Sequence, residues 1–146
     1  MTHEEKALQI MGDYSNCAQA VLGAYAEELG LTAEQARKVS FCFFSGMRKA
    51  EVCGACSGAL MALGLKYGQT EKGDTETRLK GVALTEQFLE RFKAENGSYI
   101  CRDILGCDIS DPEAAEHARS TGLFKTVCPK MVASAARIVE EMLEEN

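Results

Sequence analysis

Hydrophobic residues recur along this chain at the three- and four-residue spacing of amphipathic helices, with polar residues between them. The stretches Thr2–Glu5 and Thr32–Gln35 have the form of capping boxes, which mark helix starts. Both prolines, Pro112 and Pro129, fall in the first turn of a predicted helix, where the missing N–H of proline is tolerated. No stretch alternates in the manner of a half-buried strand. The pattern therefore predicts an all-α fold.

Glycines and caps divide the chain into helical segments. A first helix is predicted from Thr2 until Gly12, and further helices over residues 17–29, 33–44, 53–67, 75–95, 99–105, 112–121 and 128–143. Residues 45–51, around Gly46, are predicted to form a loop. We expect residues 1–146 to form a single domain, a bundle of about seven helices with 53–67 and 128–143 at its centre.

Charge and composition exclude several classes of function. The chain has 146 residues and a net charge of −6. An acidic surface argues against a nucleic-acid partner, because binding phosphate requires a basic patch. The polar, acidic N-terminus does not have the layout of a secretory signal, and the apolar run 59–65 is far shorter than the roughly 20 residues that span a bilayer. We therefore expect a cytoplasmic protein without membrane insertion.

Seven cysteines are unusual for such a chain, because a reducing compartment favours metal or redox roles over structural disulfides. Four of them fall at predicted helix starts: Cys17, Cys53, Cys101 and Cys128. A helix start has unpaired N–H groups and a positive dipole end, which stabilise thiolate. Basic residues stand near three of the four in sequence: Arg48, Lys49, Arg102, Lys125 and Lys130. We predict that Cys53 is more acidic than a free cysteine, and that Cys42 is a packing residue.

The stretch EVCGACSGALMALG, residues 51–64, contains the densest pattern. Gly54, Gly58 and Ala62 recur every fourth position and share one helix face, which indicates close approach of another helix or of a cofactor. Helix packing is the favoured interpretation. The same stretch places Cys53 and Cys56 about 60° apart around the helix, a spacing that suits a dithiol.

The familiar cysteine motifs each fail on a detail. The C-x-x-C of thioredoxin-like proteins lies between a strand and a helix, and no strand is predicted. Attachment of a c-type haem requires histidine directly after the second cysteine, where Ser57 stands. A four-cysteine zinc ribbon requires a second close pair, and five residues separate Cys101 from Cys107.

Four stretches together match one family: NCAQAVL, EVCGACSGALMALGLKYG, CRDILGCD and GLFKTVCP. With them the sequence resembles the C_GCAxxG_C_C family, redox-active proteins of bacteria and archaea, from residue 16 to the end. The resemblance implies that the family's cysteines are Cys17, Cys53, Cys101 and Cys128, and that Cys107 is common in relatives. It also implies that Cys56 occupies a variable position and that relatives often have glycine in place of Cys42. The implied activity is thiol redox chemistry or metal-cluster binding.

The first hypothesis is a metal site, because four thiolates match the ligand number of an iron–sulfur cluster or, alternatively, of structural zinc. The chain has only two histidines, His3 and His117, so thiolates are the obvious ligands. The favoured ligand set is Cys53, Cys101, Cys107 and Cys128, with Cys17 able to replace one member.

The second hypothesis is a metal-free thiol switch or oxidoreductase, in which Cys53 attacks a disulfide and Cys56 or Cys128 resolves it. Cys53 and Cys56 are then the catalytic residues, although the resemblance favours Cys56 as an extra cysteine. The third hypothesis is a structural module that forms a homodimer through an apolar stripe on helix 75–95, made of Leu79, Val82, Leu84, Phe88 and Phe92. The redox partner is not identified by the sequence.

Overall fold

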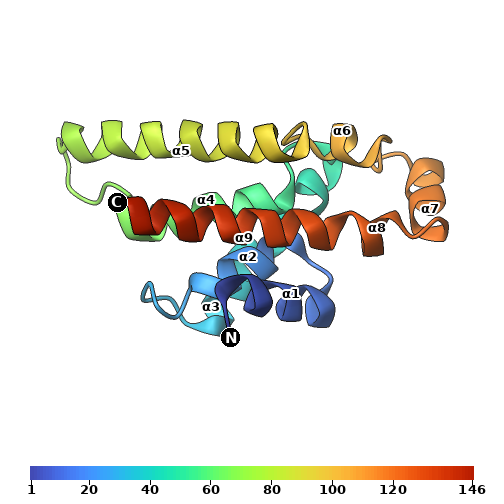
Figure 1. Cartoon of the computed structure of the whole chain (residues 1–146), viewed down its shortest axis with the longest axis horizontal. Coiled ribbons are helices and arrows are strands. Elements are labelled where there is room, and N and C mark those ends of the chain that lie inside the picture. The colour runs from blue at the N-terminus through green and yellow to red at the C-terminus, as the bar shows by residue number, and fades with distance from the viewer.

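The computed structural model describes residues 1–146 as helices joined by short connections (Figure 1). The α-helices are α1 (His3–Tyr14), α2 (Cys17–Tyr25), α3 (Ala33–Ser40), α4 (Gly54–Tyr67), α5 (Thr75–Asn96), α6 (Cys101–Leu105), α7 (Pro112–Ser120), α8 (Leu123–Thr126) and α9 (Cys128–Glu145). A 3₁₀ turn, Phe41–Phe43, and a second short turn, Gly46–Ala50, connect α3 to α4. The predicted all-α fold is confirmed, and the single turn α8 is an addition to the predicted helices.

Local capping explains where most helices begin and end. Thr2 and Thr32 form complete capping boxes, as predicted. α1 continues past Gly12, so the predicted end there is wrong: the left-handed conformation of Ser15 (φ 51°) ends the helix instead. α3 is shorter than predicted, because the chain tightens into the 3₁₀ turn after Ser40. These differences move helix ends by a few residues and leave the order of the helices intact.

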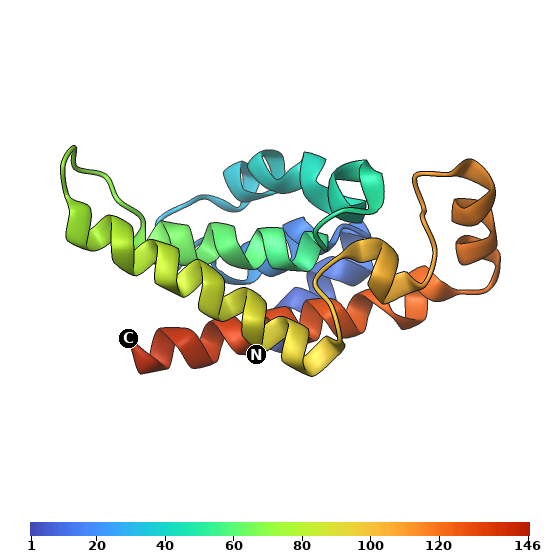
Figure 2. The same ribbon diagram turned by 90° about the horizontal axis from the view of Figure 1, so that it is seen from above.

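α2, α4 and α9 form the centre of the molecule. α2 is buried over most of its length, with Val21, Leu22 and Tyr25 in the core. α4 packs against α2, α5 and α9, so α4 and α9 are central as predicted and α2 joins them. α4 and α9 run in the same direction and α5 runs back beside them (Figures 1 and 2). The starts of α4 and α9 therefore lie at the same end of the molecule.

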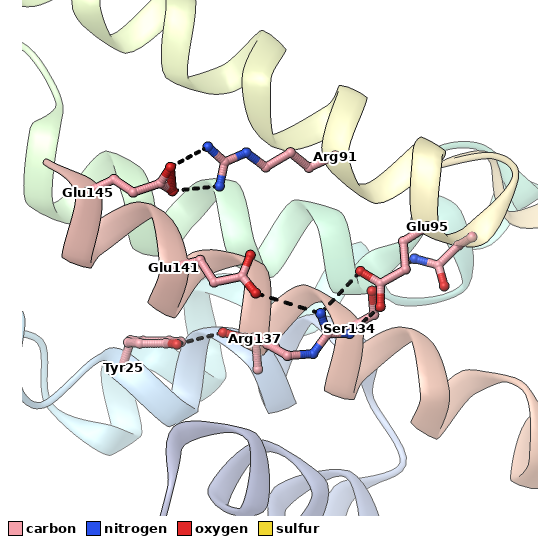
Figure 3. Close-up of polar contacts among 9 residues, drawn as sticks. Tyr25, Arg91, Glu95, Ser134, Arg137, Glu141 and Glu145 are labelled. Carbon is pink, nitrogen blue, oxygen red and sulfur yellow. Dashed lines mark hydrogen bonds and ion pairs between the residues drawn. The ribbon is translucent and has the colours of Figure 1, made fainter.

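Polar contacts hold α9 against its neighbours. Figure 3 shows the Arg91 guanidinium on α5 donating two hydrogen bonds to the Glu145 carboxylate on α9, at 2.6 and 2.7 Å. Because this ion pair is largely exposed, it contributes about 1 kcal/mol or less. The buried Tyr25 hydroxyl donates to the Ala136 carbonyl at 2.6 Å, which leaves no unpaired hydroxyl between α2 and α9.

The apolar stripe of α5 divides into two halves. Leu84, Phe88 and Phe92 are buried in the core, whereas Leu79 is 62% exposed and Val82 is 45% exposed. The second half of the stripe therefore belongs to the core. The first half is exposed, so the homodimer through this stripe stays a hypothesis. None of the helices combines the length and the apolar character that crossing a membrane requires.

His3 joins the start of α1 to α2 and α9. Its ring stacks on Tyr25 with the centroids 4.2 Å apart, and its two nitrogens lie 2.8 Å from the carboxylates of Glu140 and Glu28. Burial is the largest single effect on the pKa of His3, and it lowers this pKa because it disfavours the charged ring. The hydrogen bonds to Glu140 and Glu28, with their charges, together outweigh burial and raise the pKa of His3. A protonated His3 therefore stabilises the docking of α1.

Candidate functional site

Four cysteines from four separate segments line one cavity of about 570 Å³. Cys17, Cys101 and Cys128 are the first residues of α2, α6 and α9, and Cys53 is the N-cap of α4. The predicted placement of these four cysteines at helix starts is confirmed. The remaining walls come mainly from α1, the turn before α4, and α6 to α9.

An isolated β-bridge brings Cys53 next to Cys101. Val52 and Ile100 form the antiparallel bridge, directly before the two cysteines. The Cys53 N–H donates to the Tyr99 carbonyl at 2.8 Å, and the Cys101 N–H donates to a carbonyl in the facing segment at 2.5 Å. A single bridged pair is too short to produce an alternating pattern, so the sequence contained no signal for this contact.

Glycines bring the start of α4 close to the start of α2. A Cβ atom at Gly58 would lie 2.5 Å from the Ala18 carbonyl oxygen. A Cβ atom at Gly54 would lie 3.1 Å from the Phe43 oxygen and 3.3 Å from the Cys17 Cβ. The predicted close packing of this helix face is confirmed. Its consequence for the site is that Cys17 and Cys53 can both reach the same cavity.

Cys53 and Cys56 lie together at the start of α4, Cys53 as the N-cap and Cys56 in the first turn. Cys53 is 6% exposed, and Cys56 is fully buried. The Cys56 thiol donates to the Cys53 sulfur and so lowers the pKa of Cys53 against the opposing effect of burial, with further help from the N–H groups of Ala55 and Cys56. Burial, followed by the same hydrogen bond, raises the pKa of Cys56. The direction agrees with the predicted acidity of Cys53.

Cys17 and Cys128, at the starts of α2 and α9, shift each other's pKa. Both are half-buried. The hydrogen bond between them lowers the pKa of Cys128 and, together with burial, raises the pKa of Cys17. Burial, with the charges of Cys53 and Cys128, raises the pKa of Cys101 to about 12. The thiols of Cys53 and Cys128 are therefore more acidic, and those of Cys17, Cys56 and Cys101 less acidic, than an ordinary cysteine.

The turn between α3 and α4 has an unusual backbone. Ser45, Gly46, Met47, Arg48 and Ala50 all have positive φ, between 56° and 62°. Only glycine adopts this left-handed conformation routinely, and each other residue costs about 1–2 kcal/mol. The predicted loop around Gly46 is therefore a strained left-handed turn. It lies beside the cysteines, and Ser45 and Arg48 line the cavity.

The basic neighbours of the cysteines separate into two groups. Arg48 and Lys125 line the cavity, whereas Lys49 and Lys130 do not. Arg102 pairs instead with Glu51 at 3.0 Å. Of the basic residues that lie near the cysteines in sequence, only some therefore face the cavity.

Three of the seven cysteines do not line the cavity: Cys42, Cys107 and the buried Cys56. Cys107 follows α6 and packs against a small second cluster that includes Leu105 and Ile109, so it does not line the cavity. Cys42 is exposed in the 3₁₀ turn, so the prediction that it is a buried packing residue is wrong. No group of three or more His, Cys, Asp or Glu side chains is arranged so that it could hold a metal ion.

The fold and the site define an all-α protein with a cysteine-lined cavity at one end. The chain belongs to the C_GCAxxG_C_C family: the family model, described as "Putative redox-active protein (C_GCAxxG_C_C)", matches residues 15–142. Comparison with the curated proteins and with the solved structures found no match. The resemblance predicted from the four cysteine-containing stretches is confirmed.

Proposed function

We propose that this protein carries out thiol–disulfide exchange at the cavity, with Cys17–Cys128 and Cys53–Cys56 as two dithiol pairs. The observation that carries the proposal is the placement of the cysteines: Cys17, Cys53 and Cys128 line one cavity at helix starts, and Cys56 lies in the first turn of α4, directly after the N-cap Cys53. Attack on a disulfide requires a thiolate, and resolution requires a second thiol close to it. Each pair offers both.

Cys128 is the better placed of the two thiolates to attack, because it is half-buried whereas Cys53 is 6% exposed. Its thiolate attacks one sulfur of a substrate disulfide, R–S–S–R, forms a mixed disulfide and expels R–S⁻. Cys17 then attacks the Cys128 sulfur, the second R–S⁻ leaves, and the Cys17 proton passes to a departing thiolate. The protein dithiol loses two electrons and the substrate disulfide gains them.

Cys53 and Cys56 pass through the same two steps with Cys56 as the resolving thiol. This role departs from the resemblance, which treats Cys56 as an extra cysteine. The charge of Cys53 acts on both Cys17 and Cys128: it adds to the raised pKa of Cys17 and opposes the lowering of the pKa of Cys128. Oxidation of Cys53 removes that charge, so the redox state of one pair changes the acidity of the other.

A redox titration tests the proposal. The protein is equilibrated in glutathione buffers of graded potential, its thiols are trapped by alkylation, and the linkages are mapped by peptide mass. We expect the two disulfides Cys17–Cys128 and Cys53–Cys56. Cys17→Ser should abolish the first and Cys56→Ser the second, whereas the exposed Cys42→Ser should change neither. Cysteines that stay reduced throughout, or that link only in other combinations, would overturn the proposal.

A metal or iron–sulfur site is the second candidate, and the observation that favours it is the number of cysteines at the cavity. Cys17, Cys53, Cys101 and Cys128 equal the ligand number of a cluster or of structural zinc, with Cys17 in place of the predicted Cys107. A bound cluster would supply electron transfer. The arrangement of the side chains does not fit an ion, because no three ligating side chains converge. A brown preparation with stoichiometric iron and sulfide after anaerobic purification would favour this candidate over thiol exchange.

A further inference from the structure

The cavity wall has the opposite charge to the protein as a whole. The chain has 22 acidic and 16 basic residues. Yet the cavity is lined by Arg48, Arg119 and Lys125 and by no acidic residue. A hollow lined by one sign of charge focuses its field and concentrates ligands of the opposite sign. The cavity is therefore suited to an anion, although the protein surface repels one.

Two of these cations have no carboxylate to neutralise them. Arg119 pairs with Glu116 at 2.6 Å, whereas Arg48 and Lys125 take part in none of the ion pairs of the structure. The Arg48 guanidinium lies 5.2 Å from the centre of the Phe44 ring. The left-handed turn fixes the backbone of Arg48 beside the cysteines, at φ 62°.

The size and the apolar walls of the cavity define the rest of the ligand. A volume of about 570 Å³ lies within the range of small-molecule sites. Fourteen of the 22 lining residues are hydrophobic, among them Leu8, Phe124 and Met131. A ligand that fits these walls has an apolar body and an acidic group.

We infer that the substrates of this cavity are small disulfides or thiols that combine an apolar body with a carboxylate, held by Arg48 and Lys125. The sulfur step rests on the proposed function: the Cys128 thiolate attacks the substrate disulfide and expels one half as an anionic thiolate. The two cations act on the charge of the substrate and not on the sulfur chemistry, so the inference has a separate test.

Two aromatic disulfides of similar size separate charge from reactivity. The probe 5,5′-dithiobis(2-nitrobenzoate) carries a carboxylate on each half, and 4,4′-dithiodipyridine is neutral. We define the charge preference as the rate with the anionic probe divided by the rate with the neutral probe, each relative to the same chain unfolded in urea. Initial rates are measured at one fixed pH. Mapping the modified peptides by mass assigns the reaction to the cavity cysteines.

The native chain should show a charge preference of about tenfold or more. Arg48→Gln and Lys125→Gln should each reduce it about three- to tenfold while the neutral probe reacts at nearly the original rate. Lys49→Gln is the matched control, because it removes the same charge beside Arg48 but outside the cavity, and it should change the preference less than about twofold.

A charge preference near one, or an equal loss in Lys49→Gln, would overturn the inference and leave thiol exchange intact. A strong preference without disulfides within the protein would overturn thiol exchange and leave the anion site intact. If neither probe reacts with the native cavity thiols, both proposals fail.

Discussion

Gly58→Ala should destabilise the protein, although alanine is the better helix former. Alanine in a helix interior is favoured over glycine by about 0.5–1 kcal/mol. At Gly58 the new Cβ would meet the Ala18 carbonyl oxygen at 2.5 Å and the Ala18 Cα at 3.1 Å. Both are backbone atoms, so α2 must move away from α4. Overpacking of this kind costs about 1–3 kcal/mol, and a backbone contact belongs in the upper half of that range. The net loss is about 1–2 kcal/mol.

Gly64→Ala is the matched control on the same helix. Gly64 is exposed, and a Cβ there would have no neighbour within 4 Å. The substitution should stabilise by about 0.5–1 kcal/mol. The two variants should therefore differ by about 1.5–3 kcal/mol, with opposite signs. Gly54→Ala should fall between them, because its closest contacts lie at 3.1 Å.

Urea unfolding followed by far-UV circular dichroism, under reducing conditions, measures these differences. The midpoints should separate while the slope with denaturant stays constant, because the surface exposed on unfolding changes little. If Gly58→Ala and Gly64→Ala shift the midpoint equally in the same direction, α4 does not approach α2 as described, and the route by which Cys17 reaches the cavity is wrong.

Three further predictions concern single side chains. The stabilising effect of His3, measured against His3→Gln, should be fully present below about pH 6.5, the unfolded pKa. It should diminish as the pH rises through the raised pKa of the folded state, and an effect independent of pH would contradict the contact with Glu140. Cys56→Ala should raise the pKa of Cys53, because it removes the largest cause of the lowering; alkylation rates against pH, restricted to the Cys53 peptide, measure this, and an unchanged midpoint counts against the pair. Gly46→Ala should lower the melting temperature, since its φ of 59° is left-handed and the new Cβ would collide with the backbone that follows; an unchanged melting temperature would argue against the strained turn.

Local features could be predicted from the sequence, because capping and glycine conformation depend on neighbouring residues. Thr2 and Thr32 cap as predicted, and the cysteines at the starts of α2, α4, α6 and α9 lie where the sequence places them. The set of cysteines that line the cavity could not be predicted. Cys107 follows the left-handed Gly106 beyond the end of α6, so it lies outside the cavity. The partner of Cys128 depends on how α2 meets α9, a long-range contact without a local pattern.

The convergence of helix starts links the acidity of the sulfurs to the charge of the ligand. α2, α4 and α9 all present their N-terminal ends near one cavity, so the positive ends of three helices of at least nine residues point towards the same sulfurs. Arg48 and Lys125 add two charges that no carboxylate cancels. The positive helix ends favour thiolate, and the two cations favour an anionic substrate. The thiolate that the substrate expels is also an anion, so the same field stabilises it. Lys125→Gln should therefore slow the anionic probe while the neutral probe keeps nearly its original rate, because only the anionic probe loses its own attraction to the cation.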